Sequence, residues 1–289
     1  MIHLLALLGV VSISFSAVFI RLALVSPVTA TFYRGAYALP VLAILWFAGR
    51  GGDRRTSRDR LLAFVGGLFL AGDLNLWHES IALVGAGLGT VIPNVQIVFV
   101  ALVGWLVYGE RPSGKTIGLV GLVLVGVALT SGLARGDAYG QAPVRGVALG
   151  IGAGLSYAVF LLLFRRSNRV LAPTAGPLFD ATAGTVAGAL LSVPFDPQFT
   201  LAVSGTAHLW LLLLALVSQV IGWLCIATAL PRLPAVETSV LLLFQPVCAI
   251  GWGVVFFDER LSTVQWAGAA IVLFGVATLS ASGRTARAT

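Results

Sequence analysis

Long apolar stretches alternate along the chain with short segments in which Arg, Asp, Pro and Gly gather. A helix needs about 20 mostly apolar residues to cross a bilayer, and a window of about 19 residues finds ten such stretches here. They cover residues 2–21, 28–48, 61–82, 87–108, 116–133, 145–165, 174–194, 208–230, 237–257 and 263–282. The pattern predicts an all-α integral membrane protein of ten transmembrane helices, with loops too short for a soluble catalytic domain.

The composition agrees with this pattern. Of the 289 residues, 58% are hydrophobic and only 10% are charged, and the mean hydropathy is +0.98. Soluble domains carry about 25% charged residues because their surface faces water. An ordinary soluble protein is therefore excluded.

The positive charges indicate an orientation. With the N-terminus inside, thirteen Lys and Arg residues fall in cytoplasmic segments, four fall on the opposite side, and Arg34 lies within the second span. Such a bias is what the positive-inside rule describes. We expect both termini to be cytoplasmic. The net charge of +7 then reflects topology and contact with the lipid bilayer, and no nucleic-acid partner is expected.

The two halves of the chain resemble each other. Gly109-Glu110-Arg111 matches Asp258-Glu259-Arg260 at an offset of 149, and Gln96 meets Gln245 at the same offset. Because each half contains five spans, an odd number, the second half is inverted in the membrane relative to the first. We therefore predict two inverted repeats, residues 1–136 and 143–282, followed by a cytoplasmic tail, 283–289. Inverted repeats place a shared cavity near the bilayer midplane, where rocking exposes it to either side; duplication without transport is a weaker alternative.

These residues resemble the drug/metabolite transporter superfamily, specifically its EamA-like branch. Leu243-Phe244-Gln245-Pro246-Val247, followed by the Asp-Glu-Arg turn, is close to the second-repeat pattern of that branch. The first repeat departs from it, because Ile97 stands where Pro246 has its counterpart and the proline is at Pro93. The overall character is most similar to the YddG-type bacterial exporters of aromatic and other amino acids.

The resemblance implies a secondary transporter in the bacterial inner membrane. It would export small organic solutes, with amino acids that carry aromatic or other neutral side chains as the expected substrates, and would need no cofactor. Other metabolites or drugs stay open as substrates. Gly109, Gly114, Lys115 and Thr116 satisfy the phosphate-loop pattern, but that loop must follow a strand in a soluble α/β domain. We therefore expect neither ATP hydrolysis nor an ATP-binding subunit.

Polar and aromatic residues deep inside the spans are candidates for the substrate cavity. Amide and hydroxyl groups at that depth bond across helices or face a wet cavity. The candidates are Ser14, Ser16, Asn75, Trp77, His78, Asn94, Gln96, Tyr157, Gln219, Trp223, Gln245 and Trp252. Interhelical hydrogen bonds and core packing are the alternatives, and for His78 a structural hydrogen bond is favoured. Pro93 and Pro246 interrupt their helices and are hinge candidates or static bends.

Three ionisable residues within spans are candidates for structural or coupling roles, because buried charges are costly in hydrocarbon. Arg34 and Glu79 both lie toward the outer side, and we expect them to pair, unless each extends separately to the interface. Asp73 lies near mid-span without a comparably placed basic residue. It is a candidate proton site, a contact for a substrate amine, or a neutral core carboxyl.

An intramembrane enzyme and a membrane scaffold are the rival classes. The acids are scattered, His78 has no Gly-x-Ser-x-Gly serine to serve, and no second histidine lies at metal-ligand spacing. A transporter, not an enzyme, and no metal site are therefore expected.

Overall fold

The structure is a computed structural model that describes residues 2–109, 113–130, 142–168, 173–233, 235–257 and 262–285. These residues form helices joined by short turns, and no strand occurs among them. The first half contains α1 (Ile2–Ser14), α2 (Ser16–Ala23), α3 (Pro27–Gly49), η1 (Arg50–Gly52), α4 (Ser57–Val91), η2 (Ile92–Val95), α5 (Gln96–Tyr108) and α6 (Gly114–Thr130). The second half contains α7 (Pro143–Ser167), α8 (Ala175–Ser192), η4 (Val193–Phe195), α9 (Gly205–Leu213), η5 (Leu214–Gly222), α10 (Trp223–Ala229), η6 (Leu230–Arg232), α11 (Ala235–Leu242), α12 (Phe244–Phe257) and α13 (Thr263–Thr285).

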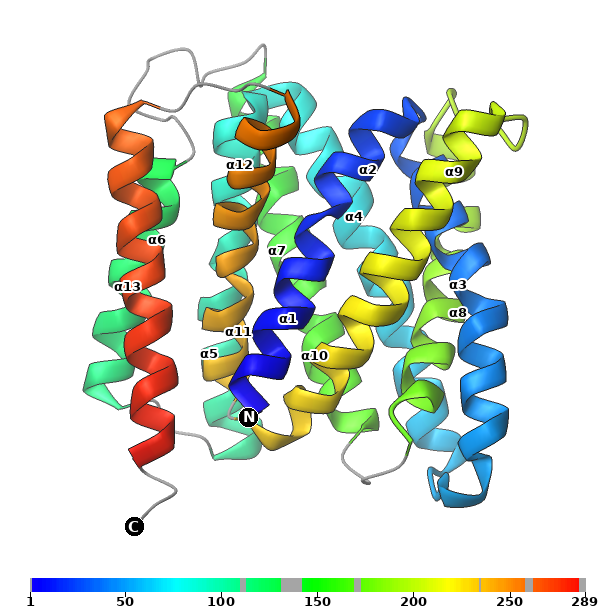
Figure 1. Cartoon of the computed structure of the whole chain (residues 1–289), viewed down its shortest axis with the longest axis horizontal. Helices are drawn as coiled ribbons and strands as arrows, with labels where there is room; N and C mark the ends of the chain where they lie inside the picture. Colours follow the sequence, from blue (N-terminus) through cyan, green and yellow to red (C-terminus); the bar gives the residue numbers. More distant parts are fainter. Residues whose placement is uncertain are drawn as a thin grey trace.

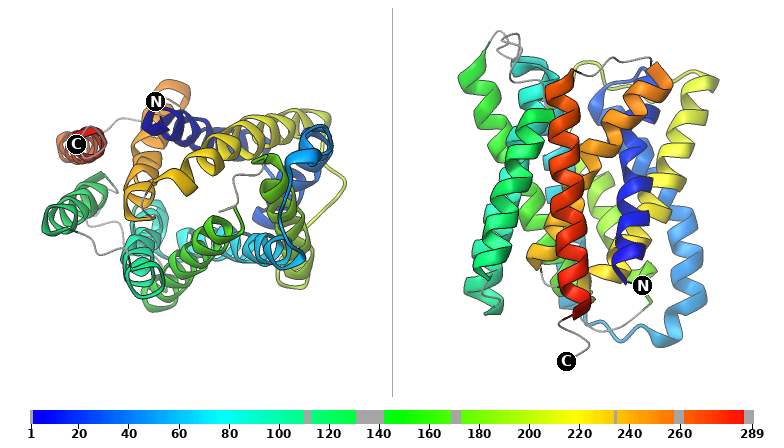
Figure 2. Two further views of the ribbon diagram at one scale, coloured as in Figure 1. Left: turned by 90° about the horizontal axis from the view of Figure 1, so that it is seen from below. Right: turned by 60° about the vertical axis from the view of Figure 1, so that its left-hand side comes forward.

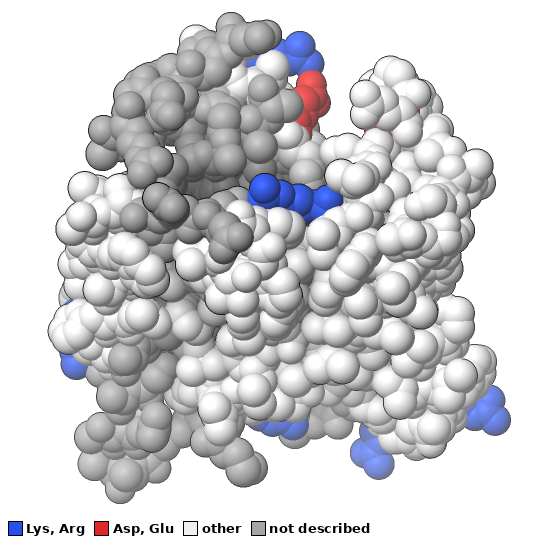
Figure 3. All heavy atoms as spheres, turned by 45° about the horizontal axis from the view of Figure 1, so that its top comes forward, with Lys and Arg blue, Asp and Glu red and all other residues white. Residues whose placement is uncertain are grey.

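Within the described residues, seven helical stretches are long and apolar enough to cross a membrane. The predicted spans over 87–108, 116–133 and 263–282 are not among them, although the last two contain shorter apolar helices, Ile117–Gly126 and Trp266–Gly275. Many large apolar side chains are exposed, including Leu4, Ile44 and Phe274. In Figure 3 most of the charged side chains lie in the upper part of the view and along the lower edge, and most of the described surface is uncharged. This surface fits a lipid environment.

One predicted loop is wrong. The sequence pattern separates the third and fourth spans at residues 83–86, whereas α4 continues without interruption to Val91. The intervening segment contains Gly, Ala, Leu and Val but no proline, and glycine costs a helix only about 1 kcal/mol. The break comes instead at η2, which contains Pro93.

The helices pack in matching pairs (Figures 1 and 2). The α3 helix lies against α8, and α6 lies against α13 at one side of the molecule. The α4 helix packs on α7 and α8, while the stretch from α9 to α10 packs on α1 and α3. The contacts of α4 with α7 and α8 thus have counterparts, with the halves exchanged, in the contacts of the α9–α10 stretch with α1 and α3.

Glycines permit the closest of these contacts. A Cβ atom on Gly67 of α4 would lie 1.8 Å from the carbonyl oxygen of Ala181, and one on Gly184 of α8 would lie 1.9 Å from that of Phe64. Where α7 crosses η2, a Cβ on Gly154 would lie 2.6 Å from the Pro93 oxygen. Small residues let helix backbones approach closely inside membranes, so these crossings depend on the absence of a side chain.

A buried ion-pair network closes the turn between α3 and α4, which we call the α3–α4 strap (residues 50–56). Arg55 binds Asp53 through two N–H···O bonds of 2.9 and 3.0 Å, and it donates to Asp180 of α8 at 2.7 Å. Burial opposes ionisation of Asp53, but hydrogen bonds from Arg55 and Trp46 prevail and lower its pKa to about 2. The strap is therefore attached to the second half of the chain.

A second strap lies at the opposite end of the same helix pair. This α8–α9 strap (residues 193–204) contacts the start of α3, where Asp196 accepts from the Val28 amide at 3.3 Å. Thr29 exchanges hydrogen bonds with the Thr200 backbone, and the Tyr33 hydroxyl donates to the Leu201 carbonyl at 2.7 Å. The α3–α8 pair is thus held at both ends.

Candidate substrate cavity

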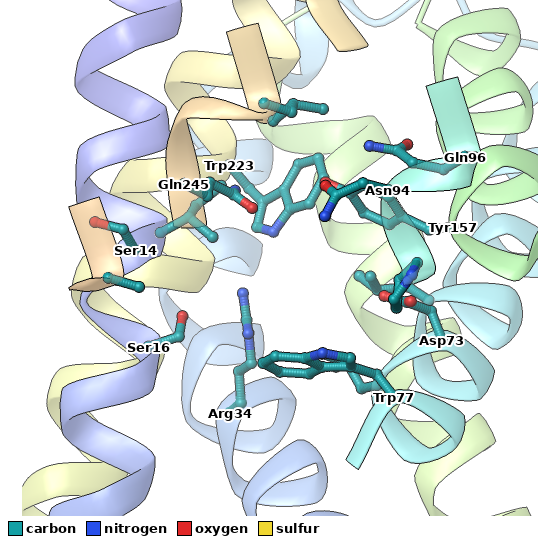
Figure 4. Close-up of a pocket in the computed structure, with 16 residues that line it drawn as sticks. Ser14, Ser16, Arg34, Asp73, Trp77, Asn94, Gln96, Tyr157, Trp223 and Gln245 are labelled. Atoms are coloured by element: carbon teal, nitrogen blue, oxygen red, sulfur yellow. The ribbon is translucent and has the colours of Figure 1, made fainter. Parts of the chain in front are cut away.

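A cavity of about 190 Å³ lies between the two halves of the chain (Figure 4). Helices α1 to α5 contribute from the first half, and α7, α10, α11 and α12 contribute from the second. The lining residues are Ile13, Ser14, Ser16, Arg34, Leu70, Asp73, Leu74, Trp77, Pro93, Asn94, Gln96, Tyr157, Trp223, Leu242, Gln245 and Ala249.

Irregular backbone surrounds this cavity. Ser14 and Ser16 flank the break between α1 and α2, Asn94 belongs to the 3₁₀ turn η2, and Gln245 follows the break between α11 and α12. Trp223 comes directly after η5, a π-helical stretch. Departures from α-helix inside a membrane are tolerated where backbone is buried in protein or lines a cavity, and π-turns are frequent at functional sites.

Arg34 is the buried cation of the cavity, with 5% of its surface exposed. Its Nε donates to Gln219 Oε1 of η5 at 2.7 Å, and Gln219 Nε2 donates to Thr182 Oγ1 of α8 at 3.0 Å. The wide π-turn places Gln219 between the two helices. Because Nε is used in this bond, the guanidinium is held with its terminal nitrogens toward the cavity, as Figure 4 shows.

Asp73 is the acidic residue of the same cavity and projects from α4 (Figure 4). Among the described residues, no hydrogen bond or ion pair reaches its carboxylate. The expectation that Asp73 has no comparably placed basic residue is wrong, because Arg34 lines the same cavity.

Several other polar atoms of the lining are buried without a hydrogen-bond partner among the described residues. They are Ser16 Oγ, Gln96 Oε1, Trp223 Nε1 and Gln245 Nε2. Buried polar groups are nearly always hydrogen-bonded. Two donors, an acceptor and a hydroxyl of the lining residues thus lack partners among the described residues.

The structure places eight of the twelve predicted cavity residues in the lining and four elsewhere. Asn75 donates to Ser192 of α8 at 2.8 Å, because its side chain points toward α8 and away from the cavity. His78 Nδ1 lies 2.6 Å from the Leu74 carbonyl oxygen, the structural hydrogen bond favoured for it. Gln219 lies outside the lining and accepts a hydrogen bond from Arg34 Nε. Trp252 Nε1 donates to Ser14 Oγ at 2.8 Å, so it supports a lining residue from outside.

The expected pair of Arg34 and Glu79 is wrong. Glu79 binds Arg145 at 2.6 Å on an exposed surface, whereas Arg34 is buried against Gln219. Of the hinge candidates, Pro93 lies in the lining and in η2, and Pro246 is the third residue of α12, just after the second helix break.

Sequence reasoning missed the apolar part of the lining, namely Ile13, Leu70, Leu74, Leu242 and Ala249. Helical spacing could have found two of them. Residues three and four apart share a helix face, so a cavity at Asp73 and Trp77 implies Leu70 and Leu74. The others carry no signal that separates them from neighbouring apolar residues.

A cavity lined by residues of both halves of an apolar helical protein is the arrangement expected of a membrane transporter. The EamA-like transporter family matches the chain twice, over residues 1–132 and 144–281. The chain belongs to this family.

Two bacterial relatives and one solved structure are similar to this chain. It is 26% identical to the threonine/homoserine exporter RhtA of Salmonella typhimurium, over 79% of this chain and 74% of the relative. It is 24% identical to a probable amino-acid metabolite efflux pump of Escherichia coli, over 66% of each chain. A solved structure described only as the crystal structure of a protein superposes with a TM-score of 0.81 at 20% identity, over 96% of this chain and 98% of that one. This last likeness concerns the fold alone.

Proposed function

We propose that the protein is a secondary transporter that exports amino acids, including aromatic and other neutral ones, by alternating access. The observation that carries the proposal is the cavity that residues of both halves line, several of which have buried polar atoms without partners among the described residues. Rocking of the halves would expose such a cavity to each side in turn.

The size and chemistry of the cavity support a small metabolite as the solute. Its volume of about 190 Å³ is below the roughly 300–1,000 Å³ of pockets that hold drug-sized ligands. Trp77, Tyr157 and Trp223 supply aromatic surface. The names of the two bacterial relatives, an amino-acid metabolite efflux pump and a threonine/homoserine exporter, support amino acids as the class. Other metabolites and drugs are the second candidates.

The proposal includes ten spans arranged as two inverted repeats, residues 1–136 and 143–282. The double family match supports two units, and so does the exchange pattern of helix contacts. The straps add a local counterpart. A 3₁₀ turn precedes both Asp53 and Asp196, and the side chain of each accepts a hydrogen bond from the amide two residues later. Because these straps lie at opposite ends of the α3–α8 pair, their equivalence supports inversion.

We expect the protein in a bacterial inner membrane with both termini in the cytoplasm. The thirteen to four distribution of Lys and Arg supports this orientation, and the start of α1 and the end of α13 lie at the same end of the molecule (Figure 1). Two exposed strap positions test it. A membrane-impermeant maleimide should label Gln198→Cys in intact cells and Gly51→Cys only in inside-out vesicles. The opposite labelling pattern would reverse the topology.

Counterflow in proteoliposomes tests the transport activity. Vesicles loaded with unlabelled amino acids should take up labelled phenylalanine or threonine in a saturable way, with and without a pH gradient. Gln245→Leu removes a buried donor of the lining and should reduce entry at least about tenfold while the protein remains folded. Gln198→Leu, on an exposed strap, is the matched control and should transport normally.

The negative results separate the alternatives. Entry of other solutes but of no amino acid would favour the exporter of other metabolites or drugs. No saturable entry of any solute, with folded protein, would favour the enzyme or scaffold readings. Normal flux in Gln245→Leu would contradict the assignment of the cavity as the substrate site.

A further inference from the structure

We propose that Arg34 and Asp73 recognise the two charged ends of a single α-amino acid, Arg34 the carboxylate and Asp73 the ammonium group. The proposal rests on the transport function proposed above and assigns the residues that determine its specificity.

The first observation is that the two charges share the cavity without joining each other. Both line it, and the described residues contain no hydrogen bond or ion pair between them. In Figure 4 both side chains point into the cavity, with the ring of Trp77 alongside. An α-amino acid carries its own opposite charges on one carbon, so it complements a cation and an anion that face a common space.

The second observation is the fixed position of the guanidinium. Gln219 binds Nε and is itself bound to Thr182, so Arg34 is oriented from behind by two helices. The terminal nitrogens are left for a planar, charge-assisted interaction with a carboxylate. A flexible arginine would lose more freedom on binding, and the chain from Thr182 through Gln219 avoids this loss.

The third observation concerns the charges in the lining as a whole. Among the described lining residues, Arg34 and Asp73 are the only ones that carry a charge. The carboxylate and ammonium groups of the amino acid would occupy Arg34 and Asp73. An acidic or basic side chain of the substrate would then find no charged partner in the lining. A buried charge without a partner is costly. The aromatic and apolar walls, together with the unpartnered amides of Gln96 and Gln245, suit a neutral side chain.

Competition against labelled phenylalanine in the counterflow assay tests the recognition of both ends. Phenylalanine amide lacks the carboxylate, and 3-phenylpropionate lacks the ammonium group. In the wild type each should compete at least about tenfold more weakly than phenylalanine. The same comparison with threonine, threonine amide and 3-hydroxybutyrate applies if threonine gives the stronger counterflow. These measurements need no variant, so they remain decisive if a substitution prevents folding.

Two variants assign the ends. Arg34→Gln should bind the amino acid at least about tenfold more weakly and should no longer discriminate against the amide. Asp73→Asn should lose discrimination against the des-amino acid instead. Arg145→Gln and Glu79→Gln change an exposed ion pair and serve as charge-matched controls with wild-type competition.

The outcomes distinguish this proposal from the transport function. The amide and the des-amino acid could compete as strongly as the amino acid itself while amino-acid counterflow is saturable. That result would overturn the recognition by Arg34 and Asp73 and leave the transport function intact. An Asp73→Asn variant that keeps the wild-type competition pattern but loses its response to a pH gradient would make Asp73 a proton site and would also overturn the proposal. Absence of amino-acid counterflow in the wild type would overturn both.

Discussion

Gly184→Ala is expected to lower the thermal stability of the protein in detergent by at least about 5 °C. The new Cβ atom would lie 1.9 Å from the Phe64 carbonyl oxygen, which belongs to the backbone of α4 and has no rotamer to change. The two helices must separate, and every contact along their crossing loosens with them. Overpacking of this kind costs about 1–3 kcal/mol or more, and each kcal/mol shifts Tm by about 2–4 °C in a chain of 150–250 residues.

The matched control is Gly121→Ala in the middle of α6. A Cβ atom there meets nothing within 4 Å, and alanine is favoured over glycine in a helix by about 0.5–1 kcal/mol. We expect its melting temperature to stay the same or rise. Equal melting temperatures for Gly184→Ala and the wild type, measured by intrinsic fluorescence, would show that the α4–α8 crossing is less close than described.

Some helices are predicted almost to their ends, because bilayer thickness sets the length of an apolar stretch. The apolar stretch at 28–48 coincides with α3, and the stretch at 263–282 lies within α13. Continuity through residues 83–86 could not be foreseen, because glycine and alanine weaken a helix without ending it. The π-turn at η5 also has no signature in composition. Within it, Gln219 bonds to groups 37 and 185 residues away in the chain, which local sequence does not reveal.

The candidate site, too, is only partly predictable from the sequence. Depth within a span is readable from the sequence, and it placed Trp223, Asn94 and Gln245 at the level of the cavity. The rotation of a helix about its axis is not readable when its faces are similarly apolar. For this reason depth suggested a pair between Arg34 and Glu79, although α3 turns Arg34 inward and α4 turns Glu79 toward Arg145.

The equivalence of the two straps is a third feature that the sequence does not predict. Asp53 and Asp196 occupy equivalent turns, yet Arg-Gly-Gly precedes the first and Val-Pro-Phe precedes the second. The shared feature is a backbone conformation and one carboxylate, which no comparison of residue types detects. What each strap binds also differs, because Asp53 acts through Arg55 on α8 and Asp196 acts directly on the start of α3.

Arg55→Met is expected to destabilise the protein by about 3–5 kcal/mol, because it removes the close cation of two largely buried carboxylates and leaves Asp53 only its longer 3.9 Å contact with Arg60. The side chain of Arg55 is fully buried, and those of Asp53 and Asp180 are 2% and 15% exposed. Replacing a whole buried ionic cluster by neutral groups is often close to neutral. The triple variant Arg55→Met/Asp53→Asn/Asp180→Asn should therefore recover most of the loss in thermal unfolding. A triple variant no more stable than Arg55→Met would assign the loss to packing of the arginine stem instead.

The same network gives the protein a dependence on acid. Burial disfavours the charged form of Asp53, yet the bonds from Arg55 and Trp46 prevail and bring its pKa to about 2, below the ordinary 3.8. A carboxyl whose pKa is lower in the folded state stabilises the fold above its ordinary pKa, and this contribution is lost as the pH falls through the folded value. The wild type should therefore lose stability between about pH 4 and pH 2 by an amount that Asp53→Asn does not show.

Because Arg55 links Asp53 to Asp180, this loss should release the α3–α4 strap from α8 first. Faster proteolysis between residues 50 and 56 at low pH would reveal the release. Parallel loss of stability in the wild type and Asp53→Asn would place the acid-sensitive group elsewhere.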